Sequence, residues 1–250
     1  MCGRGGTGRR AGLRSLFWLQ SGSSILLVRT TNFFFVVVSP LHFGNNWMVK
    51  ETFRDILSRC AGELGLKLTQ EAIAGLSRHY DLVAEANPLL HLTGPVSMEE
   101  FIERHTIESL ALLEFLPKNA SFIDVGPGGG FPSLPCLIAR PDLTATLIES
   151  KEKKAKFLSD AAVELGIADR VTVINKQFSE AGRVPGDIVT CRALDKFTDK
   201  LPQLFRHFPR REFLLFGGPS LREALNAEGR TFREILLPNS ERRYLFTVKG

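Results

Sequence analysis

The 250 residues are 44% apolar and 24% charged, a composition that supports a buried core and excludes a disordered, collagen-like or disulfide-stapled protein. The formal net charge of +5 suggests an acidic partner such as a nucleic acid. However, all of that charge comes from residues 1–47, which contain five arginines and no lysine or acidic residue, leaving 27 of the 32 basic side chains against 27 acidic ones. From Met48 onward the chain is formally neutral.

Three interpretations compete for residues 1–47. Their basic, acid-free composition allows a transit peptide or a signal peptide, although no A-x-A-like cleavage site follows the apolar run at 33–38. Residues 5–21 resemble the conceptual translation of a transfer-RNA gene. We therefore expect Met48 to be the true start and residues 1–47 to be a start-site artefact or a disordered leader.

The apolar run at 33–38 is far shorter than the roughly 20 residues that a membrane-spanning helix needs. The sequence thus predicts no membrane segment. The four cysteines form no C-x-x-C pair, so neither a zinc site, another metal centre nor a disulfide framework is expected. We expect a cytoplasmic protein without a metal, and a monomer.

Between residues 50 and 116 the apolar residues recur at helical spacing, which predicts a helical subdomain over residues 48–119. Breaks are expected at Asn87-Pro88 and at Gly94-Pro95. Ser97 and Glu100 have the spacing of a capping box and predict a helix over residues 98–115.

Beyond residue 120, short apolar runs alternate with amphipathic stretches of helical length. This alternation predicts an α/β fold with a doubly wound, mostly parallel sheet over residues 120–250. A terminal antiparallel hairpin is expected at 230–237 and 243–248. The other expected strands are 121–125, 144–148, 171–174, 187–191 and 212–216, and the expected helices are 132–138, 152–165 and 198–208.

The first strand of this sheet leads into a glycine-rich loop, in which Asp124, Gly126, Gly128 and Gly130 form the pattern D-x-G-x-G-x-G. Glycines at this position let the backbone approach a ligand closely. A dinucleotide fingerprint is disfavoured, because no glycine occupies the last position of G-x-G-x-x-G. Glu149 ends the second strand, where a carboxylate suits the two hydroxyls of a ribose. The structural alternative for the glycine loop is a plain turn. For Glu149 it is a favourable contact with the dipole of the following helix.

Four segments of the chain, residues 87–93, 104–109, 122–158 and 191–193, together resemble the RsmG (GidB) family of bacterial small-subunit ribosomal RNA guanine-N7 methyltransferases. The most specific pieces are the pattern R-H-x-x-[DE]-S at 104–109 and the pattern G-x-G-x-G-x-P, which is followed by Arg140-Pro141. The resemblance covers essentially residues 48–250. Two positions depart from the family: His91 replaces an asparagine, and Phe216 replaces a lysine.

The resemblance implies a Rossmann-like class I methyltransferase fold with S-adenosylmethionine as the cofactor. It implies methyl transfer to N7 of a guanine in 16S rRNA, of the guanine 527 type in the decoding-region loop. The expected partner is therefore 16S rRNA or the small ribosomal subunit. The expected cofactor-binding residues are Asp124, Gly126, Gly128, Phe131, Glu149, Phe178, Ser179 and Arg192, with Arg192 also assigned to catalysis and Arg104, His105, Lys153 and Lys154 to the substrate.

No general base is expected, because guanine N7 already carries a lone pair and catalysis then rests on alignment. Asp124 is expected to supply a negative charge near the reacting groups. Lysines near residue 153, the basic cluster at 206–211 and Arg242 with Arg243 are available to phosphates, or form solvated surfaces. The alternative functions are another class I methyltransferase acting on a small molecule or protein, an inactive ribosome-associated RNA-binding module, and a nicotinamide oxidoreductase.

Overall fold

The computed structural model describes residues 26–30, 33–37, 51–192 and 197–250, in two units, Met1–Val49 and Lys50–Gly250. In the first unit, strands β1 (Leu26–Thr30) and β2 (Phe33–Val37) pair antiparallel, where no strand was expected. The hypothesis that Met48 is the true start falls mainly outside the described residues and stays a prediction.

The second unit begins with two helices, α1 (Phe53–Glu63) and α2 (Gln70–Leu90). Thr52 caps α1 through a capping box with Asp55, and Thr69 accepts a hydrogen bond from the first turn of α2. The expected break at Asn87-Pro88 is wrong by three residues, because Pro88 lies in the last turn of α2. The helix ends instead at His91, which has a positive φ of 49°, while Asn87 Oδ1 accepts hydrogen bonds from the next two backbone N–H groups.

Residues 98–115 are helical as expected, but they do not form one regular α-helix. Ser97 accepts a hydrogen bond from the backbone N–H of Glu100 at the start of α3 (Met98–Phe101). A π-helical segment (Ile102–Ile107), α4 (Glu108–Leu110) and a 3-10 segment (Ala111–Phe115) follow. A π-helical turn widens the helix and is often found at functional sites.

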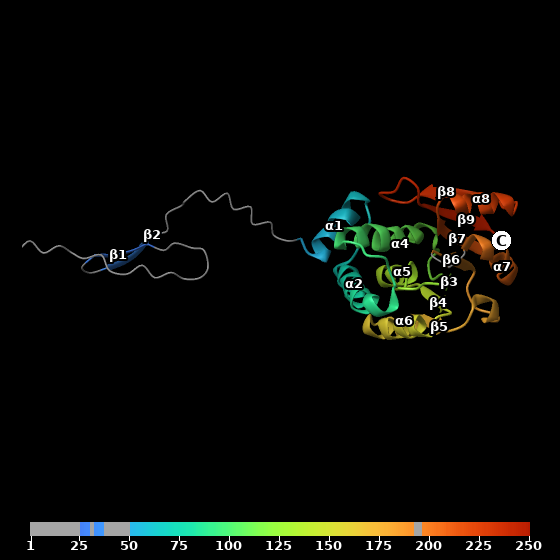
Figure 1. Cartoon of the computed structure of the whole chain (residues 1–250), viewed down its shortest axis with the longest axis horizontal. Coiled ribbons are helices and arrows are strands. Elements are labelled where there is room, and N and C mark those ends of the chain that lie inside the picture. Colours follow the sequence, from blue (N-terminus) through green and yellow to red (C-terminus); the bar gives the residue numbers. More distant parts are fainter. Residues whose placement is uncertain (1–25, 31–32, 38–50, 193–196) are drawn as a thin grey trace, which may run out of the picture. The chain divides into compact units, whose positions relative to one another are not determined.

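A seven-stranded sheet follows, in the order β5-β4-β3-β6-β7-β9-β8 (Figure 1). The first five are parallel, whereas β9 pairs antiparallel with both β7 and β8. The predicted doubly wound sheet with a terminal hairpin is confirmed. Its strands are β3 (Ser121–Val125), β4 (Thr144–Ile148), β5 (Val171–Ile174), β6 (Ile188–Cys191), β7 (Glu212–Gly217), β8 (Phe232–Leu236) and β9 (Tyr244–Lys249).

Helices pack on both faces of the sheet. They are α5 (Ser133–Ala139), α6 (Glu152–Glu164), α7 (Phe197–His207) and α8 (Pro219–Ala227). Of these four helices, only α8 had no counterpart among the expected elements.

Strand alternation divides the core into two clusters. Phe122 and Leu214 belong to the cluster that includes α1, α2, α5 and α6, whereas Ile123 and Phe213 belong to the one that includes α7 and α8. The N-terminal helices thus share a core with the sheet in one compact unit. A subdomain boundary at residue 119 stays a prediction.

Candidate functional site

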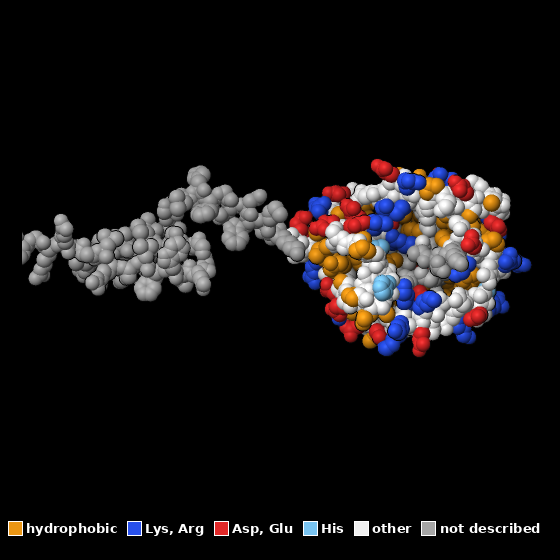
Figure 2. All heavy atoms as spheres, in the orientation of Figure 1, with side chains coloured by type: hydrophobic (Ala, Val, Ile, Leu, Met, Phe, Trp, Pro, Cys, Tyr) orange, Lys and Arg blue, Asp and Glu red, His pale blue; other side chains and the backbone are white. Residues whose placement is uncertain are grey.

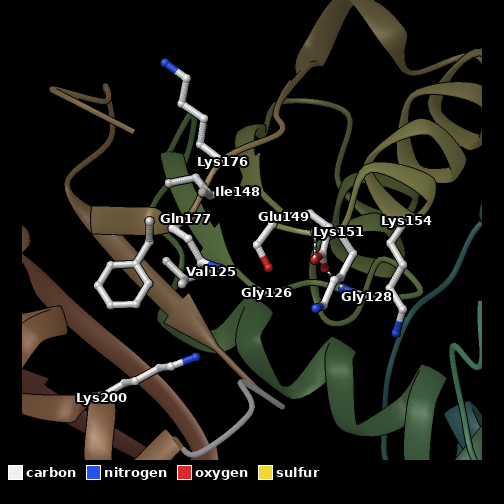
Figure 3. Close-up of a pocket in the computed structure, with 12 residues that line it drawn as sticks. Val125, Gly126, Gly128, Ile148, Glu149, Lys151, Lys154, Lys176, Gln177 and Lys200 are labelled. Atoms are coloured by element: carbon white, nitrogen blue, oxygen red, sulfur yellow. Dashed lines mark hydrogen bonds between the residues drawn. The ribbon is translucent and has the colours of Figure 1, made fainter. Parts of the chain in front are cut away.

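A pocket lies at the carboxyl ends of the parallel strands, where doubly wound sheets bind ligands. It is lined by the end of β3 and the glycine loop after it, by the end of β4, and by the segment after β5 (Figure 3). Five of the predicted site residues line this pocket: Gly126, Gly128, Glu149, Lys154 and Phe178. Residues far apart in the sequence therefore meet in one pocket.

The glycine loop has the backbone conformation that its sequence suggested. Gly126 and Gly128 have φ angles of 73° and 56°, in the left-handed region that favours glycine. A Cβ atom at Gly128 would meet no other atom within 4 Å, so that side of the loop is open space. At Gly130, by contrast, a Cβ would overlap the side chain of Leu134 at 2.4 Å. The loop is thus bare toward the pocket and tightly packed toward α5.

Glu149 is buried, with 5% of its surface exposed, but it also lines the pocket. Its Oε1 accepts a hydrogen bond from the Lys151 N–H (2.9 Å) and its Oε2 one from the Gly128 N–H (3.3 Å). Two carboxylate oxygens offer about four acceptor positions, so Glu149 keeps capacity for hydroxyl donors. The Asn175 side chain holds the Glu149 carbonyl oxygen at 2.8 Å.

Asp124 lies beneath the loop and is not among the residues that line the pocket. Because strand residues alternate between faces, its side chain turns toward α5, where Ser133 Oγ donates a hydrogen bond to Oδ2 (2.5 Å). Burial raises the pKa of Asp124 to about 8, with the nearby Glu149 adding to the shift. Burial thus disfavours the charged form of this carboxyl, and the expectation that Asp124 supplies a negative charge near the reacting groups stays a prediction.

Phe131 also lies outside the set of pocket-lining residues. Its buried ring packs against the rings of His79, Phe101 and His105, with centroids 5.0, 5.6 and 4.9 Å away. His79 reaches from α2 to the carbonyl oxygen of Gly129 (2.8 Å). Burial lowers the pKa of His79 to about 4 and that of His105 to about 3. Both imidazoles are neutral at physiological pH. They support the loop from the core side, His79 through its hydrogen bond to Gly129 and both rings through packing against Phe131.

Arg192 follows β6, and its guanidinium points into the helical layer. Nη2 forms an ion pair with Glu108 Oε2 (2.8 Å) and donates to the Arg104 carbonyl oxygen, and Nη1 donates to the His105 carbonyl oxygen (3.4 Å). The other oxygen of Glu108 is held by Arg243 Nε (2.5 Å). Burial raises the pKa of Glu108, whereas the two arginines lower it. The structure thus makes Arg192 part of an ionic cluster around buried Glu108, and Arg192 is not among the residues that line the pocket.

The remaining predicted residues differ in their position and exposure. Lys154 lines the pocket and donates to the His91 carbonyl oxygen (3.1 Å), whereas Lys153 and Ser179 are exposed and lie outside the lining. Lys and Arg side chains gather around the middle of the face in Figure 2. Arg104 is half-exposed and pairs with Glu100 (2.6 Å).

Sequence reasoning missed four residues that shape the site: His79, Glu108, Lys176 and Lys200. In Figure 3 the ammonium group of Lys200, from α7, points toward Val125 and Gly126, whereas Lys176 points away from them. Only Glu108 had a signal, as the acidic position of the R-H-x-x-[DE]-S pattern. The other three come to the site through tertiary packing.

Two absences concern the described residues alone. Among them, no cluster of three or more histidine, cysteine or acidic side chains has the arrangement of a metal site. No helix within the described ranges combines the length and the apolar character needed to cross a bilayer.

Residues 72–233 match the family model GidB, described as rRNA small subunit methyltransferase G. The chain is 34% identical to the ribosomal RNA small subunit methyltransferase G of Neisseria meningitidis serogroup C, over 54% of this chain and 65% of that relative. The match therefore spans somewhat less than two thirds of the Neisseria protein.

The corresponding protein of Ruegeria pomeroyi is also 34% identical, over 62% of this chain and 74% of its own length. Among solved structures, the tRNA methyltransferase TrmK of B. subtilis superposes with a TM-score of 0.49 and 14% identity, covering 58% of this chain and 66% of that one.

Proposed function

Since the chain belongs to the GidB family of rRNA small subunit methyltransferase G proteins, we propose that it transfers a methyl group from S-adenosylmethionine to N7 of a guanine in 16S rRNA. The target is a guanine of the decoding-region loop, and the substrate is the rRNA or the small ribosomal subunit. A bacterial cytoplasm is the compartment where the enzyme would meet that substrate.

The observation that carries this proposal is the pairing of the glycine loop with Glu149 in one pocket. Gly128 presents open space and a positive φ, and Glu149 holds the Gly128 N–H while keeping acceptor capacity. A bare backbone beside a buried carboxylate suits a ligand that combines a ribose with a chain running past the loop.

The residues present fit S-adenosylmethionine. Glu149 would accept hydrogen bonds from the ribose hydroxyls, Ile148 and Phe178 would flank the adenine, and the backbone at Gly126 and Gly128 would run beside the methionine portion. When bound, the cofactor supplies a methyl group carried on a positively charged sulfur. Phe131 and Asp124 would support the cofactor-binding loop from the protein core, since both side chains are buried and neither lines the pocket.

The protein's own contribution to the reaction is alignment. Guanine N7 attacks with an existing lone pair, so no side chain has to remove a proton before the transfer. Neutral His79 and His105 hold the loop without adding a positive charge beside the reacting groups. Holding the two reactants in line can supply several kcal/mol, of the order of 7, of the barrier reduction.

Cofactor binding is tested by calorimetry with S-adenosylhomocysteine. We expect one site per chain, and we expect NADH, as a dinucleotide control, not to bind. Absence of S-adenosylhomocysteine binding would support an inactive RNA-binding module, and tight NADH binding would support an oxidoreductase.

The reaction is tested with radiolabelled S-adenosylmethionine and small subunits that lack the modification. We expect label at a single guanine N7, located by mapping the modified base in the 16S rRNA. Label in a ribosomal protein or a small molecule, with none in the rRNA, would instead favour another class I methyltransferase.

A further inference from the structure

Glu108 is 1% exposed, and it joins three segments that are distant in the sequence. It lies at the start of α4, directly after the π-helical segment. Its Oε2 holds Arg192 Nη2 (2.8 Å) after β6, and its Oε1 holds Arg243 Nε (2.5 Å) in the turn before β9. One buried carboxylate therefore fixes two arginines.

The two arginines differ in what they can still bind. Arg192 is 15% exposed, and its two Nη groups donate to four protein acceptors: the carbonyl oxygens of Arg104 and His105, Ser109 Oγ and Glu108 Oε2. Arg192 is thus an anchor, because a contact from its Nη groups to an outside ligand would break one of these bonds.

Arg243 is placed differently. Its side chain is 38% exposed and gives its Nε to Glu108. Within the described part of the chain, no hydrogen-bond acceptor is recorded for its two Nη groups. Since these groups form the other edge of the guanidinium plane, they remain available for a ligand with two oxygens.

The register of the sheet puts Arg243 at the ligand-binding edge. β9 runs antiparallel to β7, and Tyr244 pairs with Gly217 at the carboxyl end of β7. The residue before Tyr244 therefore lies at the same edge as the pocket. The turn is fixed by Ser240 Oγ, which accepts from the Arg243 N–H (2.9 Å), and by the Leu237 N–H, which donates to the Arg243 carbonyl oxygen (2.9 Å).

Arg243 lies on the side of the site away from Glu149. Glu149 follows β4, whereas Arg243 precedes β9, and β3, β6 and β7 lie between β4 and β9 in the sheet. Four strand spacings amount to roughly 19 Å. If the ribose of one ligand is held at Glu149, the part of the site near β7 is open to the second reactant.

The surroundings of Glu108 also carry an excess of positive charge. Arg104, Arg192 and Arg243 all act on its titration, and the nearby acidic side chains are Glu108 itself, Glu100, which pairs with Arg104, and buried Asp124, which acts on the titration of Arg192. Arg192 and Arg243 together carry one positive charge more than Glu108, which pairs with both, and this favours an anionic group from outside. An RNA backbone supplies such a group at every nucleotide.

We propose that Glu108 is a positioning residue that holds Arg243 at the rim of the site, where the free edge of its guanidinium binds a phosphate of the substrate RNA. Arg192 anchors Glu108 from the other side. This inference rests on the proposed function, because it takes RNA as the second reactant.

The test measures binding of unmethylated 16S rRNA in the absence of cofactor, across a series of salt concentrations. Arg243→Gln should weaken binding about tenfold at low salt and reduce the slope of log K against log salt by close to one unit. Calorimetry with S-adenosylhomocysteine should give the wild-type dissociation constant. The matched control is Arg222→Gln, since Arg222 is similarly exposed and pairs with Glu234, and it should leave the RNA affinity and salt slope unchanged.

Glu108→Gln should raise the KM for RNA more than it lowers kcat, and Glu108→Asp, which keeps the carboxylate, should restore the KM to within about threefold. If Glu108→Gln does not fold, Arg243→Gln decides alone. An unchanged RNA affinity and salt slope in Arg243→Gln would overturn the inference. Absence of RNA binding and methyl transfer by the wild-type protein would instead refute the proposed function.

Discussion

His79 donates a hydrogen bond from Nε2 to the backbone carbonyl oxygen of Gly129, 2.8 Å away, and so ties helix α2 to the glycine loop. A carbonyl oxygen only accepts, so the Nε2 atom of this imidazole carries a proton. The ring is buried, and burial lowers its pKa to about 4. The bond therefore ties the glycine loop to a buried imidazole for which burial disfavours the charged form.

The first prediction concerns stability at acid pH. Because the pKa of His79 is 6.5 in the unfolded chain and about 4 in the folded protein, the unfolded state binds more protons in this interval. The stabilisation is complete above pH 6.5 and falls as the pH drops toward 4, by up to about 3 kcal/mol. His105, whose pKa is also lowered, changes the free energy of unfolding in the same direction. Asp124 acts in the opposite direction: because its pKa is raised, its contribution to the free energy of unfolding falls as the pH rises toward 8.

Urea unfolding of wild type and His79→Gln between pH 4.5 and 7.5 isolates this contribution, because glutamine can donate the same bond without titrating. The wild type should lose stability relative to the variant as the pH falls. His91→Asn, at an exposed residue with positive φ, should follow the wild-type curve. Parallel curves for wild type and His79→Gln would contradict the prediction.

The second prediction concerns the open side of the glycine loop. Gly128→Ala puts a methyl group into the pocket at a φ of 56°, so binding of S-adenosylhomocysteine should weaken at least about tenfold, while the strain costs about 1 kcal/mol of unfolding free energy. Gly62→Ala, in α1 with no atom near the added methyl, should keep wild-type affinity. Calorimetry and urea unfolding measure both effects, and unchanged affinity in Gly128→Ala would move the ligand away from this loop.

The third prediction concerns Glu149. Glu149→Gln keeps one acceptor oxygen but replaces the other with a donor that faces the N–H groups of Gly128 or Lys151. The affinity for S-adenosylhomocysteine should fall at least about tenfold, which corresponds to about 1.4 kcal/mol. Glu152→Gln, at an exposed site in the first turn of α6, should bind like the wild type. Equal affinities for all three proteins would exclude a ribose contact at Glu149.

The fourth prediction separates support from contact at Phe131. Phe131→Ala should lower the free energy of unfolding by about 3 kcal/mol, because the ring fills a buried space among His79, Phe101 and His105. Phe131→Leu should recover part of the loss. In the leucine variant the affinity for S-adenosylhomocysteine should stay within about threefold of wild type. A large loss of affinity with unchanged stability would instead make Phe131 a direct cofactor contact.

Most of the sheet could be predicted from the sequence because its strands are short apolar runs, and β3, β4, β6 and β7 are buried over most of their length. The bounds of β3, β4 and β5 match the expected ranges, and β6 and β7 each differ by one residue at one end. Helix α8 was missed because it has only nine residues and starts at Pro219 directly after Gly217-Gly218, a combination that is also typical of a turn. The π-helical turn at 102–107 was also beyond the sequence pattern, because helical spacing alone does not distinguish it from an α-helix.

The site was predictable where its residues follow strand ends. Gly126, Gly128 and Glu149 meet because parallel strands bring their carboxyl ends to one edge. The direction of a side chain at that edge was less predictable: Asp124 faces α5 because it is one residue out of phase with Val125. Phe216, where the family has lysine, is buried, and the Arg192 guanidinium lies 5.8 Å from its ring centre.

The position of β9 has a consequence for synthesis. Although it follows β8 in the chain, it lies between β7 and β8 in the sheet. Until Tyr244–Lys249 has emerged from the translating ribosome, β7 ends in an open edge and β8 lacks the strand with which it pairs. A nascent chain stalled before that point would carry a complete glycine loop on an unfinished, aggregation-prone sheet, with the Glu108–Arg243 pair still unformed.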